Sequence, residues 1–293
     1  MIGLNYTFLE DVWPTETTHA RIWDMGVSWR DIHIAVDVYD WTRLDTVVDR
    51  MVAAGLNITY CVGLTPQWLA KYPNQPYYKT YYGPGSNSMP WSVDEFNKFI
   101  WNLATRYKGK IKNYEIWNEP QLAEYLYPYE TAETNTLATM TQRAYNTIKS
   151  IDSTALVLSA SLLPRTSSGG MTRAQKYLNS MQLKGYPVDA WTCHIYPEGT
   201  TNQGAIWKGY YDTTLNEIKA RGTGTNKLWV TETAFGLLQG PIAADKCYQY
   251  TEAIYSHMNS FVFWYAWNRP DLGGATVKFG SPQWEAIKTY HLA

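Results

Sequence analysis

The sequence predicts an α/β fold, a single (β/α)8 barrel that spans residues 1–293. Eight short apolar runs recur along the chain, and segments of helical periodicity separate nearly all of them. Runs such as 155–158 and 261–264 are continuously apolar, as is typical of parallel strands covered by helices on both faces. A barrel of this kind usually needs about 250 residues. The alternative, a doubly wound open sheet, would need a glycine-rich phosphate turn after a strand, and the sequence has none.

Most of the eight predicted strands end in polar or aromatic residues. The strands lie near residues 2–5, 27–32, 57–64, 113–119, 154–161, 188–196, 227–233 and 260–267. Working residues of such barrels lie on the loops that follow the carboxyl ends of the strands. The polar strand ends are therefore the first place to look for a site.

Three connections carry clear helical signals, and a final helix is predicted near 284–290. The second connection ends with Gly55 at a helix C-cap, and the third begins with Ser92 and Glu95 in capping-box spacing. The buried faces follow helical periodicity. They comprise Leu44, Val47, Val48 and Met51 in the second connection, Phe96, Phe99, Ile100, Leu103 and Tyr107 in the third, and Cys247, Thr251, Ile254 and Met258 in the seventh.

The charge balance argues against two classes of partner. The chain has 25 Lys and Arg against 26 Asp and Glu, with no basic stripe, so nucleic acid and membrane surfaces are not expected partners. No stretch approaches the roughly 20 apolar residues of a membrane span. The 14 Trp and 24 Tyr outnumber the 7 Phe, and rings with a polar edge suit sugar binding as well as burial. We expect a polysaccharide or oligosaccharide partner and a monomer.

The three cysteines Cys61, Cys193 and Cys247 are odd in number and far apart, so we expect packed thiols. The N-terminus enters a strand-like run without a signal peptide. We nevertheless expect the protein to act outside the cell or at its surface, through a delivery route that these residues do not encode.

Two strands end in a glutamate. Pro120 ends the fourth strand and leaves Glu119 at its carboxyl edge, and the seventh strand runs into Glu232. Glycosidic bond hydrolysis needs one carboxyl group to protonate the departing oxygen and another to attack the sugar or activate water. The fourth and seventh strands lie on roughly opposite sides of a barrel, so these side chains can converge across its mouth. Their separation, about 5 Å for retention or 6.5–9.5 Å for inversion, is not fixed by the sequence.

The motif Trp117-Asn118-Glu119-Pro120, paired with Thr231-Glu232, resembles clan A of the retaining glycoside hydrolases. With Arg30 and the segment 64–68, it is most similar to family 39 and its relatives. The resemblance implies that Glu119 is the general acid/base, Glu232 the nucleophile and Asn118 a ligand of the sugar 2-hydroxyl. The chain has no room for the β-sandwich domain of that family's xylosidases and iduronidases, so their substrates do not transfer.

The charges fit these roles, because an ionised Glu232 would raise the pKa of a nearby Glu119 and keep it protonated. Glu115 is expected to point inward and to need a buried partner. Arg30 is predicted to orient the nucleophile through a bidentate contact, or to form a core salt bridge to Glu115.

Further candidates follow other strands. His194 and Tyr196 alternate toward one face at the end of the sixth strand, where clan members hold the nucleophile. Trp267 is predicted to be either a stacking floor for the sugar or a plain core residue. The clan often has a non-proline cis peptide after this residue, at Trp267–Asn268. His33 follows Arg30 and is predicted to contact the ligand or to be a hydrogen-bonded structural residue.

The loop 65–91 is long enough to suggest function. Its rings either wall a sugar-binding cleft or pack the loop on the barrel, and Trp68 is our substrate-binding candidate among them. These rings are Trp68, Tyr72, Tyr77, Tyr78, Tyr81, Tyr82 and Trp91.

No cofactor is expected. The five histidines include no pair at metal-binding spacing, and a serine-nucleophile elbow is absent from the sequence. The sequence therefore predicts a retaining glycoside hydrolase that works by double displacement and cleaves internal bonds. The alternative is a non-catalytic carbohydrate-binding barrel, a module of a cell-surface or phage-borne assembly.

Overall fold

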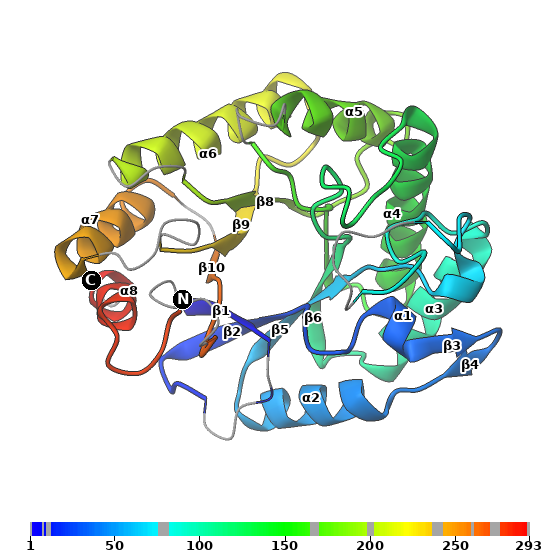
Figure 1. The fold of residues 1–293 in the computed structure, drawn as a ribbon, viewed down its shortest axis with the longest axis horizontal. Helices are drawn as coiled ribbons and strands as arrows, with labels where there is room; N and C mark the ends of the chain where they lie inside the picture. Colours follow the sequence, from blue (N-terminus) through cyan, green and yellow to red (C-terminus); the bar gives the residue numbers. More distant parts are fainter. Residues whose placement is uncertain are drawn as a thin grey trace.

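Parallel strands form a barrel that helices surround, as Figure 1 shows for the computed structural model. The structure describes residues 2–7, 9, 13–75, 82–164, 170–197, 202–235, 243–258, 261–269 and 276–291. Within them, one sheet has the strand order β7-β6-β5-β2-β1-β10-β9-β8, and a parallel bridge between Leu158 and Ala190 joins its two edges. The strands are β1 (Ile2–Tyr6), β2 (Thr17–Ile22), β5 (Asn57–Val62), β6 (Ile111–Ile116), β7 (Leu156–Leu158), β8 (Trp191–Ile195), β9 (Leu228–Thr233) and β10 (Val262–Trp264). The predicted (β/α)8 barrel is confirmed.

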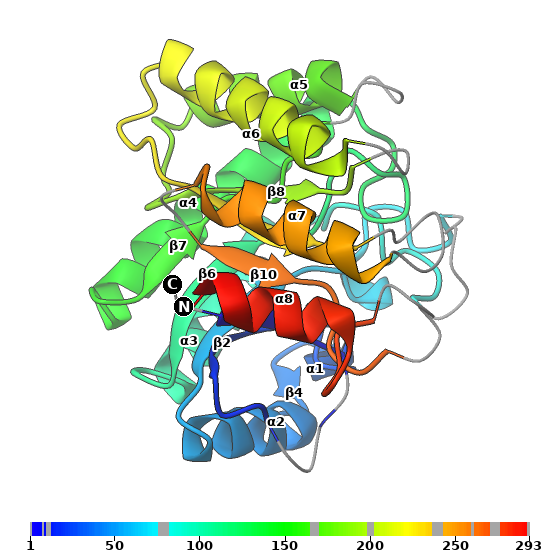
Figure 2. The ribbon, with the colours of Figure 1, turned by 90° about the vertical axis from the view of Figure 1, so that its left-hand side faces the viewer.

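The outer helices lie along the barrel wall, and α7 and α8 lie side by side outside β10 (Figure 2). These helices are α2 (Thr42–Ala53), α3 (Val93–Arg106), α4 (Thr131–Ile151), α5 (Gly170–Gln182), α6 (Gln203–Ala220), α7 (Ala244–Tyr255) and α8 (Pro282–His291). Shorter elements occupy the rim: helix α1 (Trp29–Ile32), a hairpin of β3 (His33–Ala35) and β4 (Val38–Tyr39), and the 3-10 turn η1 (Gln67–Leu69). Among the described residues, no helix is both long and apolar enough to cross a membrane.

The second strand was predicted in the wrong place. Residues 27–32 hold the short helix α1, and the strand that pairs with β1 and β5 is β2, ten residues earlier in the chain. The β2 sequence TTHARI has no continuous apolar run, because Arg21 points into a polar barrel interior. A search for apolar strands therefore passes over it.

The helix signals are confirmed. In α2 the predicted face is buried, and Gly55 follows the helix with a positive φ of 75°, a conformation that suits glycine. At the start of α3 the Ser92 hydroxyl accepts a hydrogen bond from the backbone N–H of Glu95. The predicted face of the seventh connection is buried as well, and α8 extends the predicted last helix slightly at both ends.

Several smaller predictions have clear outcomes. Cys61, Cys193 and Cys247 are buried free thiols, as expected. A non-proline cis peptide is present, but between Tyr265 and Ala266, because β10 ends at Trp264 and the bend comes earlier than predicted. Of the rings in the loop 65–91, Tyr77, Tyr78 and Tyr81 lie outside the described residues.

Candidate active site

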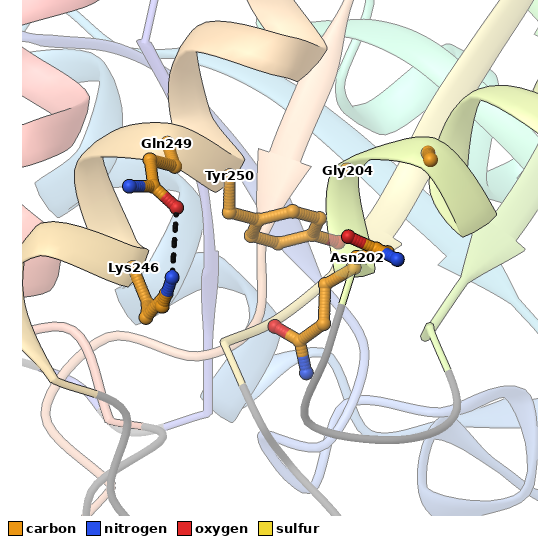
Figure 3. Close-up of a pocket in the computed structure, with 7 residues that line it drawn as sticks. Asn202, Gly204, Lys246, Gln249 and Tyr250 are labelled. Atoms are coloured by element: carbon orange, nitrogen blue, oxygen red, sulfur yellow. Dashed lines mark hydrogen bonds between the residues drawn. The ribbon is translucent and has the colours of Figure 1, made fainter.

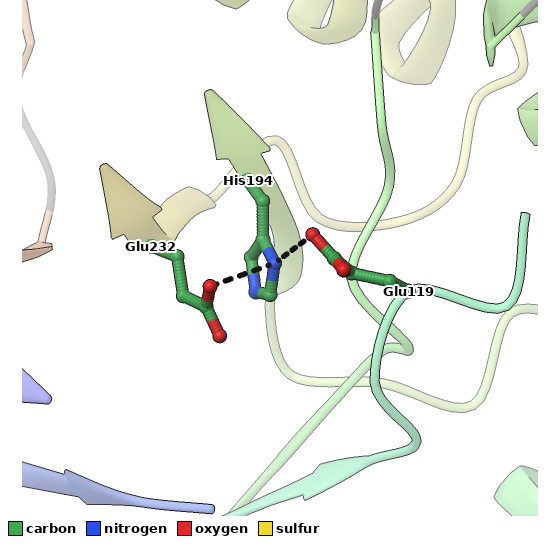
Figure 4. Close-up of side chains that lie close together, drawn as sticks. All are labelled: Glu119, His194 and Glu232. Carbon is green, nitrogen blue, oxygen red and sulfur yellow. Dashed lines mark hydrogen bonds and ion pairs between the residues drawn. The ribbon is translucent and has the colours of Figure 1, made fainter. Parts of the chain in front are cut away.

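Glu119 and Glu232 lie close together over the carboxyl end of the barrel. Glu232 belongs to β9, and Glu119 stands in the loop after β6. One atom each from Glu119, His194 and Glu232 lie within 4.8 Å of one another, and Figure 4 shows the histidine ring between the two carboxylates. Two residues that are 113 positions apart in the sequence thus share one small space.

His194 links the two carboxylates. It comes from β8 and is fully buried, and its Nδ1 lies 2.8 Å from Oε1 of Glu119 and 3.5 Å from Oε2 of Glu232. The sequence predicted that His194 lies beside the nucleophile, and the structure places it against both glutamates. Its position fixes the distance between them.

Two further donors hold the Glu232 carboxylate. Arg21 Nη1 donates to Oε1 at 2.6 Å, and the Tyr196 hydroxyl donates to Oε2 at 2.5 Å. Burial raises the pKa of Glu232, while the positive charges of His194 and Arg21 and the hydrogen bond from Tyr196 work in the opposite direction. The donors therefore offset part of the cost of keeping this carboxylate ionised.

Arg21 is the site residue that the sequence analysis missed. It is fully buried in β2 and donates to Glu115 Oε2 at 2.6 Å, Asn5 Oδ1 at 2.9 Å and Asn118 Oδ1 at 2.9 Å, in addition to Glu232. Burial alone would lower the pKa of Arg21, but the charges of Glu115 and Glu232 more than offset this and raise it. The signal available in the sequence was an arginine inside a strand whose neighbours alternate in polarity.

The role predicted for Arg30 is therefore wrong. Arg30 lies on α1 at the rim, while Arg21 makes both contacts that were considered for Arg30, the one to the nucleophile and the salt bridge to Glu115. Glu115 is buried and also accepts from the Thr231 hydroxyl at 2.8 Å, so its predicted structural role is supported.

The loop after β6 has an unusual backbone. Trp117 and Glu119 have positive φ values of 88° and 37°, which L-residues seldom adopt. The backbone N–H of Glu119 donates to the Ser161 hydroxyl at 2.9 Å, and the Trp117 indole donates to the Tyr125 carbonyl at 2.9 Å. These bonds hold Asn118 and Glu119 in place, and the part played by Ser161 could not be predicted from the sequence.

Trp267 packs as its core alternative predicts. Trp267 is only 2% exposed and packs edge-on against Phe279 and Trp284, so it belongs to the core. Another ring, Tyr125, feels the charge of Glu119. Burial raises the pKa of Tyr125 and the charge of Glu119 adds to the effect, and Tyr125 packs against Trp23.

The remaining predicted substrate contacts lie together at another part of the rim. Arg30, His33 and Trp68 line one cavity of about 620 Å3. His33 is buried, and its carbonyl accepts from the Trp68 indole at 2.8 Å. Neither glutamate is among the residues that line this cavity, although the sequence had grouped all of them in one site.

The side chains of Glu119, His194 and Glu232 are also near enough to hold a metal ion. The guanidinium of Arg21, 2.6 Å from Glu232, already pairs with this carboxylate and would repel a cation bound to it. The set therefore fits acid, base and nucleophile chemistry better than metal ligation.

Another cavity, of about 310 Å3, lies between the first turns of α6 and α7 (Figure 3). Its lining includes Asn202, Lys246, Gln249 and Tyr250, and Lys246 donates to Gln249 at 3.1 Å. None of the described residues that line it carries a carboxylate.

Comparison with solved structures finds the same fold in carbohydrate-active enzymes. A glucosidase from Croceicoccus marinus has a TM-score of 0.68 at 12% identity, and the match covers 95% of this chain but 61% of that one. A hyperthermostable endo-1,4-β-D-mannanase from Thermotoga petrophila has a TM-score of 0.65 at 15% identity, with 100% and 99% covered. A xylanase from Paenibacillus barcinonensis has a TM-score of 0.60 at 18% identity, with 92% and 88% covered. At these identities the likeness concerns the fold.

The family itself is shown by sequence. No curated protein matches the chain. A profile described as "Cellulase (glycosyl hydrolase family 5)" matches residues 23–270, which include both glutamates, His194 and Tyr196. The resemblance to clan A is thereby confirmed, whereas family 39 is not the family that matches. The chain belongs to glycosyl hydrolase family 5 and is a glycoside hydrolase of clan A.

Proposed function

We propose that this protein is an endo-acting hydrolase of β-1,4-linked polysaccharides, with Glu232 as nucleophile and Glu119 as general acid/base. The observation that carries the proposal is the close approach of these two carboxylates, which have atoms within 4.8 Å of one another. Retaining enzymes need carboxyl groups about 5 Å apart, whereas inverting enzymes need about 6.5–9.5 Å to fit a water molecule. The geometry supports double displacement.

In the first step a Glu232 oxygen attacks the anomeric carbon, and the bond to the departing glycosidic oxygen breaks. Glu119 gives its proton to that oxygen. Arg21 and Tyr196 each hold one oxygen of the Glu232 carboxylate, so the side chain cannot turn away from the sugar. The product of this step is an ester between Glu232 and the sugar.

At the start of the second step Glu232 is uncharged, because it is esterified to the sugar. Glu119 has lost its proton and now acts as base toward water. The water attacks the anomeric carbon and the ester bond breaks, which restores both carboxyl groups. The 2.8 Å contact between His194 and Glu119 supports a role for His194 in orienting the acid/base through both steps.

Asn118 is proposed to bind the sugar 2-hydroxyl. Its Oδ1 accepts from Arg21, which turns the amide so that its nitrogen is the group left to meet a substrate oxygen. Arg21 would thus orient both the nucleophile and the amide that holds the same sugar.

The substrate proposal rests on relatives and on the shape of the rim. A mannanase and xylanases are among the structures that share this fold, and the family description names cellulase. Cavities on the barrel rim beside Trp23 and Trp68 support binding of a chain longer than one sugar. The motif likeness to family 39 supports the same two catalytic roles.

The test combines a glycan panel with stereochemistry. The unmodified protein should release reducing ends from cellulose, mannan or xylan, and NMR should show the β-anomer as first product. Glu232→Gln and Glu119→Gln should each lower kcat by about 10⁴-fold. Asp212→Asn, at an exposed carboxylate paired with His257, is the control and should leave kcat unchanged. An α-anomer as first product, or full activity in Glu232→Gln, would contradict the mechanism.

A further inference from the structure

The cavity that contains Arg30, His33 and Trp68 is set apart from the carboxylates, and we call it the distal groove. It is lined by Arg30, His33, Ile34, Pro66, Gln67, Trp68 and Pro73. These residues come from α1, β3 and the segment after β5, on the carboxyl-end rim where barrel enzymes bind their substrates. Its volume of about 620 Å3 is typical of ligand pockets, which measure about 300–1,000 Å3.

One wall of the distal groove carries a buried donor, His33 Nε2, that has no partner among the residues that the structure describes. His33 Nδ1 accepts a hydrogen bond from the Trp29 indole at 3.1 Å. Burial lowers the pKa of His33 to about 4, although Glu95 and Asp37 act to raise it, so the ring is neutral near pH 7. A neutral ring that accepts at Nδ1 carries its proton on Nε2. Within the described residues, His33 Nε2 is buried and has no hydrogen-bond partner.

The other lining groups suit a sugar. Trp68 is half-buried and its N–H is already bound to the His33 carbonyl, so its free surface is the apolar ring. Gln67 is exposed and donates to the Pro73 carbonyl at 3.2 Å, which leaves its amide oxygen as an acceptor. A ring face beside separate donors and acceptors matches the apolar faces and hydroxyl edges of a pyranose.

The distal groove connects with the reaction centre through Arg30. That residue also lines a smaller cavity of about 140 Å3, together with Trp23, Leu64 and Tyr82. The Trp23 ring lies 5.9 Å from that of Tyr125, whose hydroxyl is near enough to feel the charge of Glu119. Arg30 is thus common to the two cavities, and Trp23 and Tyr82 of the smaller one belong to the same cluster as Tyr125.

The charges around Arg30 favour a neutral ligand. Asp24 and Asp31 line the smaller cavity with Arg30, so its positive charge is opposed by carboxylates. The carboxylate of a uronic acid would gain little binding energy here, because Asp24 and Asp31 would repel it. Neutral hydroxyl groups can accept hydrogen bonds from the guanidinium without such repulsion.

We propose that the distal groove is a subsite for neutral sugar units of the same polysaccharide chain that is cleaved at Glu119 and Glu232. This inference rests on the proposed function for the identity of the chain. The bound chain runs from the carboxylates past Trp23 and Arg30 to Trp68. The groove gives the enzyme a preference for long substrates over short ones.

The test measures chain-length preference in Arg30→Ala and Gln67→Ala. The probes are the β-1,4-linked hexasaccharides and trisaccharides of glucose, mannose and xylose. In each variant the ratio of kcat/KM for hexasaccharide over trisaccharide should fall by about tenfold, because contacts at the far sugar units are lost. Gln67 is exposed, so its truncation leaves folding intact. Arg143→Ala, at an exposed arginine of α4 that lines neither cavity, should keep the ratio.

Binding of the same hexasaccharides to Glu232→Gln, measured by calorimetry, separates this inference from the proposed function. If no glycan is hydrolysed but Arg30→Ala still weakens hexasaccharide binding about tenfold, the proposed function fails and the groove stands. If hydrolysis occurs and neither truncation changes the length ratio, the groove is refuted and the function stands. Absence of any hexasaccharide binding refutes the groove as well.

Discussion

The Tyr196 hydroxyl donates a hydrogen bond to Glu232 at 2.5 Å, and Tyr196→Phe removes this bond while it keeps the ring. This hydrogen bond lowers the pKa of Glu232, so Tyr196→Phe should raise it. The proposed nucleophile must be ionised, and the acid limb of the kcat/KM profile should therefore move to higher pH in the variant, while the activity on the alkaline side changes less.

The measurement is a pH–rate profile of the unmodified enzyme and of Tyr196→Phe on the same glycan. Tyr145→Phe on α4 removes a hydroxyl outside the site and should leave the acid limb in place. An unmoved limb in Tyr196→Phe, or a shift to lower pH, would show that this hydroxyl does not stabilise the ionised nucleophile.

At the scale of single residues, the sequence predicted the side chains that follow strand ends. Glu119, Glu232, His194 and Tyr196 all meet because the carboxyl ends of neighbouring strands share one rim. Arg21 and Ser161 could not be predicted in the same way, because one lies inside a strand and the other acts by accepting from a backbone N–H. For Trp267 two alternatives stayed open, because sequence cannot tell a core ring from one that faces a ligand.

Two exposed glycines, one after a helix and one within a helix, allow the effect of backbone conformation on stability to be tested. Gly55 follows α2 with a φ of 75°, and Gly55→Ala should lower the free energy of unfolding by about 1 kcal/mol because an L-residue is strained there. Gly209 lies within α6 with open space around it, so Gly209→Ala should raise stability by about 0.5–1 kcal/mol.

Urea unfolding of both variants measures the two differences, and each glycine serves as the control for the other. If the free energy of unfolding changed in the same direction in both variants, backbone conformation would not decide the effect of the added methyl group.

At the scale of elements, helices were easier to predict than strands. The periodic faces of α2 and α3 and their end signals lie within a few neighbouring residues, so the sequence contains them directly. Strand β2 depends on partners far away in the chain, because its arginine is acceptable in the interior only when Glu115 and Glu232 are near. The neighbouring segment 27–32, although partly apolar, became a short helix.

At the scale of the whole molecule, buried histidines should make stability depend on pH. Burial lowers the pKa values of His19 and His33 to about 4, whereas an unfolded histidine titrates near 6.5. Between these values the unfolded chain binds protons that the folded protein does not, so the free energy of unfolding should fall as pH drops from about 6.5 toward 4.

Urea midpoints at pH 7.5 and pH 5 test this effect. In His33→Phe, which keeps a ring beside Tyr39 but cannot titrate, the fall between the two pH values should be smaller than in the unmodified protein. An equal fall in both proteins would show that His33 is not a source of the pH dependence.

The barrel architecture was the easiest feature to predict, because the strand and helix pattern recurs along the chain and every repeat indicates the same fold. The shapes of the rim loops were not predictable. Arg30, His33 and Trp68 were each singled out from the sequence, yet only the structure brings them into one groove apart from the carboxylates. The contacts that position them run between loops and depend on side-chain packing.

The guanidinium of Arg21 bonds to residues of β1, β6 and β9 as well as to the loop after β6, so it helps to assemble the wall of the barrel in addition to serving the chemistry. Loss of one partner of a buried ion pair commonly costs about 3–5 kcal/mol. An inactive variant intended as a glycan-capture reagent should therefore neutralise one catalytic carboxylate and retain Arg21. Removal of Arg21 would lower the stability of the stored protein as well as its turnover.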